Sequence, residues 1–350
     1  MNTDIVIVGC GVAGLYCALN LPKEKNIVIV TKSDAEKSDS YLAQGGICVL
    51  RCDDAYDSFY EDTMRAGHYE NNPESVDIMI RSSRGVIKDL ISFGVRFEKN
   101  GDEFAYAREG AHSESRILFH EDETGKEITS HLLSAVKLRK NITLIENFTM
   151  TDLIFKDGVC GGIIGHDSSG SFTAVSADYT VLATGGVGGL FRHSTNYRHL
   201  TGDSLALALK YGIKLSHIDY IQIHPTSLYT KKEGRAFLIS ESVRGEGALL
   251  LNSRGERFVD ELLPRDVVAN AIFEEMQKEG RIRYFGFSNY RTDRLKALEQ
   301  CLKERKKSGV TAVSNQWSLA GINPGGNTNP DPTLVEFSRE EYRWHCETGA

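Results

Sequence analysis

Residues 4–14 of this 350-residue chain read DIVIVGCGVAG, and this stretch decides the expected fold. The residues before Gly9 form a short apolar run rich in β-branched side chains, which is typical of a strand buried on both faces. A helical pattern follows as far as Leu21 and is stopped by Pro22, and the sequence NIVIVT at residues 26–31 predicts a second buried strand. The chain therefore opens with a β-α-β unit, which indicates an α/β fold.

The turn between the first strand and the helix matches the pattern G-x-G-x-x-G. In such a turn the first glycine permits the tight bend, the second lets the backbone approach a pyrophosphate, and the third lets the helix pack on the strand. The helix N-terminus also attracts negative charge, so the pattern predicts a dinucleotide, with a glycine-rich turn that binds nothing as the alternative. The expected contacts are Gly9, Cys10, Gly11, Val12, Ala13 and Gly14.

Lys32 follows the second strand, at the position that usually selects the nucleotide. An acidic residue there would accept a hydrogen bond from a ribose hydroxyl. A lysine departs from the usual pattern for NAD or FAD, and taken alone it would suit a 2′-phosphate. Lys32 is therefore a candidate cofactor contact whose ligand this position does not settle.

The bulk composition is that of a soluble globular protein, with 41% hydrophobic and 25% charged residues. The net charge of -7 gives no reason to expect nucleic acid or an anionic membrane as a partner. No run approaches the ~18 apolar residues of a membrane helix, and the N-terminus lacks a signal-peptide pattern, so we expect a cytoplasmic protein. The seven cysteines form no CxxC pair, which suggests neither a metal site nor a disulfide framework.

Further elements and a change of texture outline the expected domains. Residues 72–93 and 204–211 predict helices, and residues 141–155 and 179–183 predict strands. Basic residues cluster after residue 290, and residues 323–332 are rich in Asn, Gly and Pro. We expect a doubly wound dinucleotide-binding domain over residues 1–216, a further domain over 217–279, and a separate fragment over 280–350.

Six ordered motifs carry a family resemblance. They are SDSYLAQGGI at residues 38–47, ATGG at 183–186, TGDS at 201–204, QIHPT at 222–226, RGEGA at 244–248 and PRD at 264–266. Together they resemble the flavoprotein family of succinate dehydrogenases, fumarate reductases and L-aspartate oxidases. The resemblance implies that residues 1–216 are a doubly wound FAD-binding domain and residues 217–279 a partial capping domain. It implies FAD as the cofactor, held additionally by Asp39, Ser40, Tyr41, Leu42, Ala43, Gln44, Gly45, Gly46, Ala183, Gly185 and Asp203.

Two features favour the L-aspartate oxidase branch. The dehydrogenase branch attaches its flavin through a histidine beside the A-Q-G-G segment, and residues 33–44 hold no histidine, so non-covalent FAD is expected. Residues 108–118 read REGAHSESRIL and resemble a signature of the aspartate oxidases. In that branch the glutamate, here Glu109, meets the amino group of the substrate. A fumarate reductase or succinate dehydrogenase homologue is the main alternative.

The resemblance implies oxidation of L-aspartate to iminoaspartate for NAD biosynthesis, with oxygen or fumarate as electron acceptor and quinolinate synthase as a possible recipient of the product. The chemistry needs cations for two carboxylates and a group that moves a proton. His224 and Gln222 are expected to bind a carboxylate, and Arg265 to transfer the proton. Ser240 and Glu241 are expected near the substrate.

Each of these residues also has a purely structural interpretation. A histidine such as His224 is most often a satisfied core side chain. An arginine at a helix entry, such as Arg265, is usually a solvated charge, although the helix dipole disfavours it there. Ser240 and Glu241 could form a helix cap with an ion pair.

The resemblance changes near residue 280. Residues 281–289 (RIRYFGFSN) and 314–319 (SNQWSL) resemble the back half of an aldo-keto reductase, which implies a fragment of a (β/α)8 barrel with Ser288, Asn289 and Gln316 near a nicotinamide. The flavoprotein family continues with H-Y-x-x-G-G, G-L-Y-A-x-G-E and R-x-x-x-N-S-L, and none of these occurs here. We therefore expect a truncated oxidase with impaired activity. An inactive flavin-binding remnant and an NADPH-dependent reductase remain as alternatives, and the junction is either a genuine fusion or, more simply, an assembly or gene-prediction error.

Overall fold

The computed structural model describes residues 1–218, 220–229, 234–280, 286–288 and 312–314, together with residues 296, 300 and 343. The chain divides into two compact units. Unit 1 comprises Met1–Leu207, Gln222–Leu251 and Arg257–Ala269, and unit 2 comprises Ala208–Ile221, Asn252–Glu256 and Asn270–Ala350. Every contact described below for the candidate site lies within unit 1.

A six-stranded sheet forms the centre of unit 1, with the strand order β7-β2-β1-β10-β9-β8. Its strands are β1 (Asn2–Val8), β2 (Ile27–Val30), β7 (Ile142–Ile145), β8 (Thr149–Lys156), β9 (Val159–His166) and β10 (Phe172–Leu182). Strands β7, β2, β1 and β10 are parallel, whereas β9 pairs antiparallel with both β10 and β8.

The sequence predicts a parallel, doubly wound sheet over residues 1–216, and this is wrong for one strand, because β9 runs antiparallel to both of its neighbours. Strands β8, β9 and β10 are joined by short turns at Asp157–Gly158 and at residues 167–171, and such short turns allow only antiparallel pairing. The single strand predicted over residues 141–155 is two strands, because Asn147 has a φ of 56° and breaks the extended backbone between β7 and β8. The sheet is therefore mixed.

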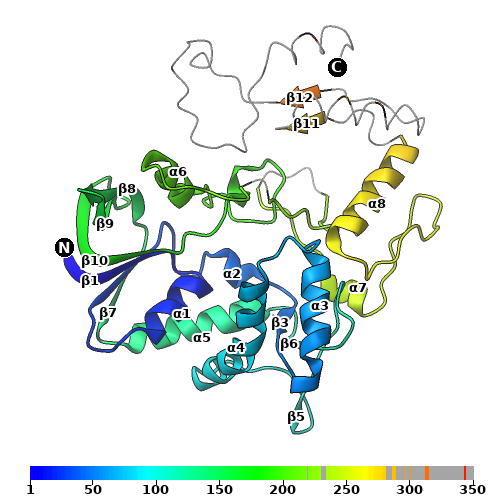
Figure 1. Ribbon diagram of the computed structural model, residues 1–350, viewed down its shortest axis with the longest axis horizontal. Helices are drawn as coiled ribbons and strands as arrows, with labels where there is room; N and C mark the ends of the chain where they lie inside the picture. Colours follow the sequence, from blue (N-terminus) through cyan, green and yellow to red (C-terminus); the bar gives the residue numbers. More distant parts are fainter. Residues whose placement is uncertain are drawn as a thin grey trace. The chain divides into compact units, whose positions relative to one another are not determined.

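The main core lies on one face of this sheet. Helices α1 (Val12–Asn20), α4 (Pro73–Ser92) and α5 (Thr124–Leu138) contribute buried apolar residues to it. From the strands it receives Ile5, Ile7, Ile27 and Ile29, which are two residues apart and therefore share a face. Figure 1 shows α1 and α5 running together along this side of the sheet. The strands predicted at residues 4–8 and 26–31 and the helix predicted at 72–93 are thus confirmed to within two residues at each end, whereas the strand predicted at 179–183 begins seven residues earlier, at Phe172.

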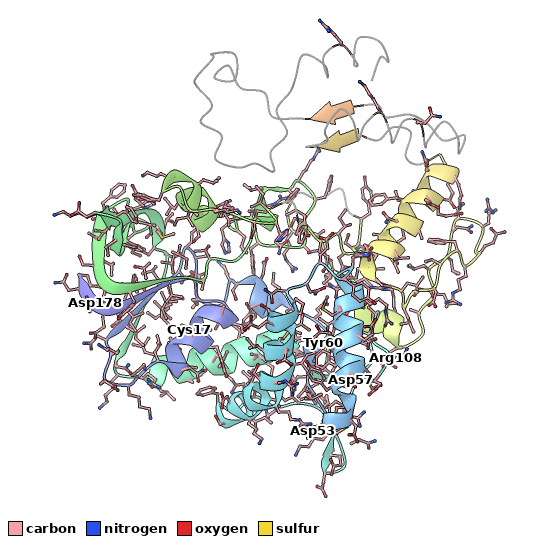
Figure 2. The ribbon with its side chains drawn as sticks, viewed as in Figure 1. Cys17, Asp53, Asp57, Tyr60, Arg108 and Asp178 are labelled. Carbon is pink, nitrogen blue, oxygen red and sulfur yellow. The ribbon has the colours of Figure 1, made fainter. Side chains whose placement is uncertain are left out.

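A second group of elements packs beside this core. It contains α2 (Asp39–Leu42), the antiparallel pair β3 (Gly46–Cys48) and β6 (Ile117–Phe119), the 3-10 turn η1 (Asp53–Ala55), α3 (Tyr56–Ala66), and the small hairpin of β4 (Lys99–Asn100) and β5 (Glu103–Phe104). Figure 2 shows Asp57 and Tyr60 on α3, and Cys17 on α1. The β3–β6 pair matters for the site because its strands connect the A-Q-G-G segment to the loop that carries Glu109.

The remaining elements follow the sheet in sequence. They are the 3-10 turn η2 (Gly188–Leu190), α6 (Asp203–Lys210), α7 (Glu241–Gly245) and α8 (Arg265–Lys278). In unit 2 the strands β11 (Gly286–Ser288) and β12 (Ala312–Ser314) pair in parallel. The predicted barrel fragment, including Asn289 and Gln316, otherwise lies outside the described residues.

Candidate active site

The glycine-rich turn lies at the junction of β1 and α1, as the sequence predicts. Gly9 has a φ of 111°, and a Cβ there would overlap the carbonyl oxygen of Ala183 at the end of β10. A Cβ at Gly14 would overlap the carbonyl oxygen of Gly9, so helix and strand can approach this closely only without a side chain. Gly11 is the N-cap of α1 and has no side chain that could cap the helix, so the start of α1 is open to a ligand apart from the N–H of Val12, which donates to Ser40 Oγ.

A cavity of about 380 Å³ opens over this turn. It is lined by the carboxyl ends of the parallel strands, where open α/β sheets bind ligands. Among the predicted cofactor contacts it includes Gly9, Cys10, Gly11, Ala13, Lys32, Asp39, Ser40, Ala183, Gly185 and Asp203. Val12 contributes differently, because its backbone N–H donates to Ser40 Oγ at 3.1 Å and ties the helix start to the segment at residues 38–47.

Lys32 has a partner that accounts for its departure from the usual acidic residue. Its Nζ donates to both carboxylate oxygens of Asp203, at 2.9 and 3.2 Å, and to Thr201 Oγ1 at 2.8 Å. The T-G-D segment therefore neutralises the lysine. Because its charge is already paired, Lys32 gives no independent reason to expect a 2′-phosphate.

A second cavity, of about 420 Å³, lies along the A-Q-G-G segment and shares Asp39 with the first. The predicted contacts Tyr41, Leu42, Ala43 and Gln44 line it, whereas Gly14, Gly45 and Gly46 line neither of these two cavities. The amide Nε2 of Gln44 donates to Asp122 at 2.8 Å. Its Oε1 is buried and has no hydrogen-bond partner among the described residues.

These observations fit FAD. The close backbone approach at Gly9 and Gly14 and the open start of α1 suit the pyrophosphate, and the unpartnered Gln44 oxygen can accept a hydrogen bond from an N–H group of a flavin ring. Such a buried acceptor without a partner costs free energy, which a bound donor would recover. We also note that the Asp39 carboxylate accepts from the Tyr197 backbone N–H at 3.0 Å and from Asn196 Nδ2, so its oxygens are largely committed within the protein.

The predicted catalytic residues meet in unit 1 beside the A-Q-G-G segment. A Cβ placed on Gly45 would lie only 2.6 Å from Glu109 Oε1, so this carboxylate lies directly against the segment. Glu241 lies next to Glu109 in space, since its Oε1 accepts a hydrogen bond from the backbone N–H of Gly110 at 3.1 Å. Its other oxygen accepts from Arg265 Nε at 2.5 Å.

Arg265 extends the cluster to Gln222. Its Nη1 donates to Gln222 Oε1 at 2.7 Å. Behind Glu241, the buried Arg244 lies with its Nη2 at 3.5 Å from Glu241 Oε2. The site thus places two neighbouring carboxylates, Glu109 and Glu241, beside the guanidinium groups of Arg265 and Arg244, and Glu241 forms an ion pair with both arginines.

Burial changes the charge states of two site residues. The pKa of Glu109 is raised by burial and by the nearby Glu241 carboxylate, against the opposing effects of Ser242 and Arg265. Burial and the Arg265 charge lower the pKa of His224 to about 4. His224 is therefore neutral near pH 7, and the Thr226 backbone N–H, which donates to its Nδ1 at 3.2 Å, leaves the proton on Nε2.

Ser240 has a structural position at this site. It is the N-cap of α7, and its Oγ accepts from the Ser242 backbone N–H at 3.3 Å. The structure thus brings Glu109, Glu241, Arg265 and Gln222 into direct contact or one residue apart, with His224 within electrostatic range of Arg265. The catalytic roles of these residues remain predictions.

Three residues at the site were not predicted from the sequence. Ser242 donates to Glu109 Oε1 at 3.1 Å, and Asp122 accepts from Gln44. Thr124 Oγ1 donates to the carbonyl oxygen of Gly45, at the start of α5. The available signal was the D-E-T-G sequence at residues 122–125, where polar residues and a glycine precede a helical pattern.

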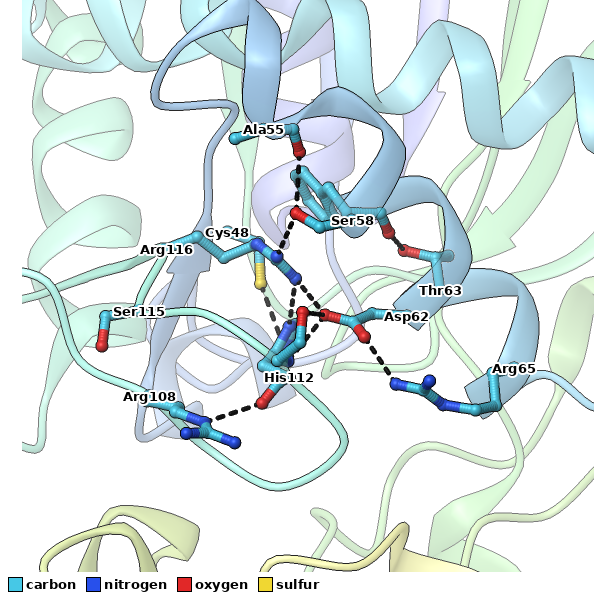
Figure 3. Close-up of polar contacts among 12 residues, drawn as sticks. Cys48, Ala55, Ser58, Asp62, Thr63, Arg65, Arg108, His112, Ser115 and Arg116 are labelled. Carbon is cyan, nitrogen blue, oxygen red and sulfur yellow. Dashed lines mark hydrogen bonds and ion pairs between the residues drawn. The ribbon is translucent and has the colours of Figure 1, made fainter.

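A buried ion pair anchors the loop that carries Glu109 (Figure 3). Asp62 on α3 accepts from Arg116 Nη1 at 2.6 Å, and these side chains are only 4% and 2% exposed. The same carboxylate oxygen accepts from the backbone N–H and the hydroxyl of Ser113, each at 2.7 Å. The carbonyl oxygen of His112 accepts from Arg108 Nε at 2.8 Å, so the loop is fixed at both ends of the predicted signature.

The fold, the dinucleotide turn and the two adjoining cavities define a flavin-binding protein of the α/β class. The family described as "FAD binding domain" matches residues 4–321. The chain therefore belongs to this FAD-binding family, and FAD is its cofactor.

Among curated proteins, the chain is similar to L-aspartate oxidases. An L-aspartate oxidase of Clostridium perfringens is 49% identical over 330 residues, covering 91% of this chain and 75% of that protein. Those of Clostridium acetobutylicum and Bacillus subtilis are 49% and 39% identical, and the chain spans only 64% and 54% of their lengths. All three are proteins that this chain resembles.

The chain is also similar to solved structures of a fumarate reductase and a succinate dehydrogenase. A quinol-fumarate reductase FrdA variant of E. coli has a TM-score of 0.75 at 26% identity, covering 79% of this chain and 51% of that one. Sdh1 of Mycobacterium smegmatis has a TM-score of 0.69 at 32% identity, covering 79% and 50%. The FAD-binding fold of the succinate dehydrogenase and fumarate reductase flavoproteins is thus present.

The comparisons also bear on the second resemblance. The match to the FAD-binding family continues to residue 321, past the boundary predicted near residue 280. These comparisons with known proteins give no support to the aldo-keto reductase resemblance. Among the described residues, no helix combines the length and apolar character required to cross a membrane.

Proposed function

We propose that the chain oxidises L-aspartate to iminoaspartate in an FAD-dependent reaction, the first step of NAD biosynthesis. The observation that carries this proposal is the position of Glu109, whose carboxylate lies against the A-Q-G-G segment and beside Arg265 and Glu241. A carboxylate there can bind an ammonium group, whereas it would repel a substrate that offers only carboxylates. The similarity to curated L-aspartate oxidases supports the same substrate.

Each site residue has a task in this reaction. Glu109 binds the amino group, and neutral His224 donates its Nε2 proton to one substrate carboxylate, with Gln222 on the same stretch of backbone. Arg265, held by Glu241 and Gln222, takes up the proton that the amino group of the substrate loses as the hydride leaves C2 and the C=N bond forms. Bound FAD supplies the acceptor for the hydride that leaves C2. Ser240 maintains the start of α7 from which Glu241 projects.

The test of the proposal is ligand discrimination by Glu109. Glu109→Gln keeps the shape but removes the charge, so we expect roughly tenfold or greater loss of affinity for L-aspartate, since hydrogen bonds to charged groups contribute ~1.5–3 kcal/mol. Affinity for succinate should stay the same or improve. Calorimetric titration of the FAD-loaded chain with both ligands measures this. Equal losses for both ligands, or none, would refute the amine-binding role.

Two alternatives are compatible with the fold. A fumarate reductase or succinate dehydrogenase homologue would bind succinate at least as tightly as L-aspartate. The similarity to solved fumarate reductase and succinate dehydrogenase structures favours this alternative. An inactive flavin-binding remnant would bind FAD and neither ligand. The same titration separates the three possibilities, because each gives a different pair of affinities.

Several finer features belong to the proposal. FAD is bound non-covalently, oxygen or fumarate accepts the electrons, and the product passes to quinolinate synthase in the cytoplasm. The domain boundaries are at residues 216 and 279. Release of intact FAD on acid precipitation of the protein tests the first of these features.

The aldo-keto reductase resemblance of residues 280–350 is a separate proposal. The parallel pairing of β11 and β12, separated by 23 residues, supports it because a β-α-β crossover produces such a pair. The fragment lacks the catalytic residues of those reductases, so we expect no NADPH-dependent aldehyde reduction. Measurable reduction would contradict this expectation.

A further inference from the structure

Two serine hydroxyls at the start of α7 form a short hydrogen-bond chain that ends on Glu109. Ser240 Oγ donates to Ser242 Oγ at 3.2 Å, and Ser242 Oγ donates to Glu109 Oε1 at 3.1 Å. Ser240 is buried, and Ser242 is half-buried. The chain of hydroxyls therefore lies inside the protein, next to the cluster of charges formed by Glu241 and Arg265.

The contacts define one consistent direction for the protons in this chain, running from Ser240 through Ser242 to Glu109. Each hydroxyl has a single proton to donate. Ser240 Oγ accepts from the Ser242 backbone N–H and gives its own proton to Ser242 Oγ. Ser242 is left with one donor, which is directed at Glu109 Oε1. In this arrangement Glu109 Oε1 is an acceptor, and the ionised carboxylate is the form that this hydrogen bond stabilises.

The surroundings of Glu109 act mostly in the opposite direction. Burial and the carboxylates of Glu241 and Asp122 favour its protonated form, whereas Ser242 and Arg265 favour the ionised form. A Cβ at Gly45 would approach Glu109 Oε1 to 2.6 Å, so the same oxygen also has little room to move. Ser242 is thus a neutral group, within the described part of the chain, that opposes the effect of the two carboxylates on Glu109.

We propose that Ser242 is a positioning residue that holds Glu109 as an ionised acceptor facing the A-Q-G-G segment, and that it thereby selects substrates with an ammonium group. The selection of substrate rests on the proposed function, but the effect on Glu109 does not. A protonated Glu109 would lose its attraction for ammonium and would accept a plain dicarboxylate more readily. Ser242 acts only through Glu109, because its hydroxyl is committed to that carboxylate.

The experiment follows the side-chain carboxyl carbon of Glu109 by 13C NMR during a pH titration of the full 350-residue chain. Glu109→Gln identifies the resonance by its disappearance. Ser242→Ala should increase the proton affinity of Glu109 roughly tenfold, since a hydrogen bond to the charged form is lost. Ser242→Thr keeps the hydroxyl and should restore the original titration. Ser134→Ala, an exposed serine of α5 that donates to Ser130 O, is the matched control and should change nothing.

A Glu109 titration that is the same in Ser242→Ala and in the unchanged chain would overturn the inference. So would a failure of Ser242→Thr to restore it, because a structural disturbance would then explain the change. Failure of the proposed function gives a different result. In that case the unchanged FAD-loaded chain would not prefer L-aspartate to succinate, while the Ser242→Ala titration would still shift.

Discussion

At the scale of single residues, burial and neighbouring charges shift the pKa values of two ionisable groups at the site, Glu109 and His224. Burial favours a protonated Glu109 and a neutral His224, and in both cases a guanidinium lies nearby. Shifted pKa values of this kind are common where a protein binds and transforms a charged substrate. They also make stability depend on pH, with a sign that can be derived for each group.

His224 gives the larger effect, since its pKa falls to about 4 in the folded chain from an ordinary value of 6.5. Between pH 6.5 and 4 the unfolded chain binds a proton that the folded chain does not, so stability falls as the pH falls through this window. We expect a loss on the order of 2 kcal/mol. His224→Gln should remove it. Urea unfolding at pH 7.5 and pH 4.5 measures the difference, and an equal pH dependence in both proteins would contradict the account.

At the scale of elements, the loop of Glu109 depends on the pair of Asp62 and Arg116. Removing one partner leaves a buried charge without compensation, which costs ~3–5 kcal/mol. We therefore expect Asp62→Asn to destabilise the fold by about that amount, and the double change with Arg116→Met to recover part of it. The exposed pair of Lys126 and Glu123, at 2.6 Å, is the control. Lys126→Ala should cost less than about 1 kcal/mol.

Urea denaturation of the two single variants and the double variant checks this prediction. Additive losses, with no recovery in the double variant, would show that the two side chains do not act as a pair.

The glycine-rich turn supports a second prediction at this scale. A Cβ at Gly14 would overlap the backbone of Gly9, whereas a Cβ at Gly11 would meet only the Ser40 hydroxyl at 2.9 Å, which can rotate away. Gly14→Ala should therefore impair folding itself. Gly11→Ala should fold and lose FAD, because its methyl group occupies the approach to the pyrophosphate. Circular dichroism and quenching of flavin fluorescence separate the two effects, and normal FAD binding by Gly11→Ala would contradict this role.

Elements with strong local patterns could be predicted from the sequence. The apolar strands β1 and β2 and the helix α4 carry continuous or periodic apolar residues, and the glycine turn has a spacing with one structural meaning. The antiparallel direction of β9 could not be predicted, because its pairing with β8 and β10 depends on the short turns at Asp157–Gly158 and at residues 167–171. The contact of Ser242 with Glu109 joins residues 133 apart and has no local signal.

At the scale of the whole molecule, the described charges limit how well the site can work. L-aspartate presents two carboxylates, yet among the described residues Arg265 is already bonded to Glu241 and Gln222, and His224 is neutral. Each charged hydrogen bond that is not made costs ~1.5–3 kcal/mol. We expect kcat/KM for L-aspartate to be at least roughly 100-fold below that of the Clostridium perfringens relative. Hydrogen peroxide production measures both enzymes, and equal values would contradict this expectation.

The most direct test of the central claim is the flavin absorbance of the FAD-loaded chain under anaerobic conditions. A single reduction needs only binding at Glu109 and hydride transfer from C2, so it is independent of the electron acceptor and of slow turnover. We expect L-aspartate to bleach the absorption band of the oxidised flavin. Succinate at the same concentration should leave the flavin oxidised. Bleaching by succinate, or an oxidised flavin with both ligands, would contradict the claim.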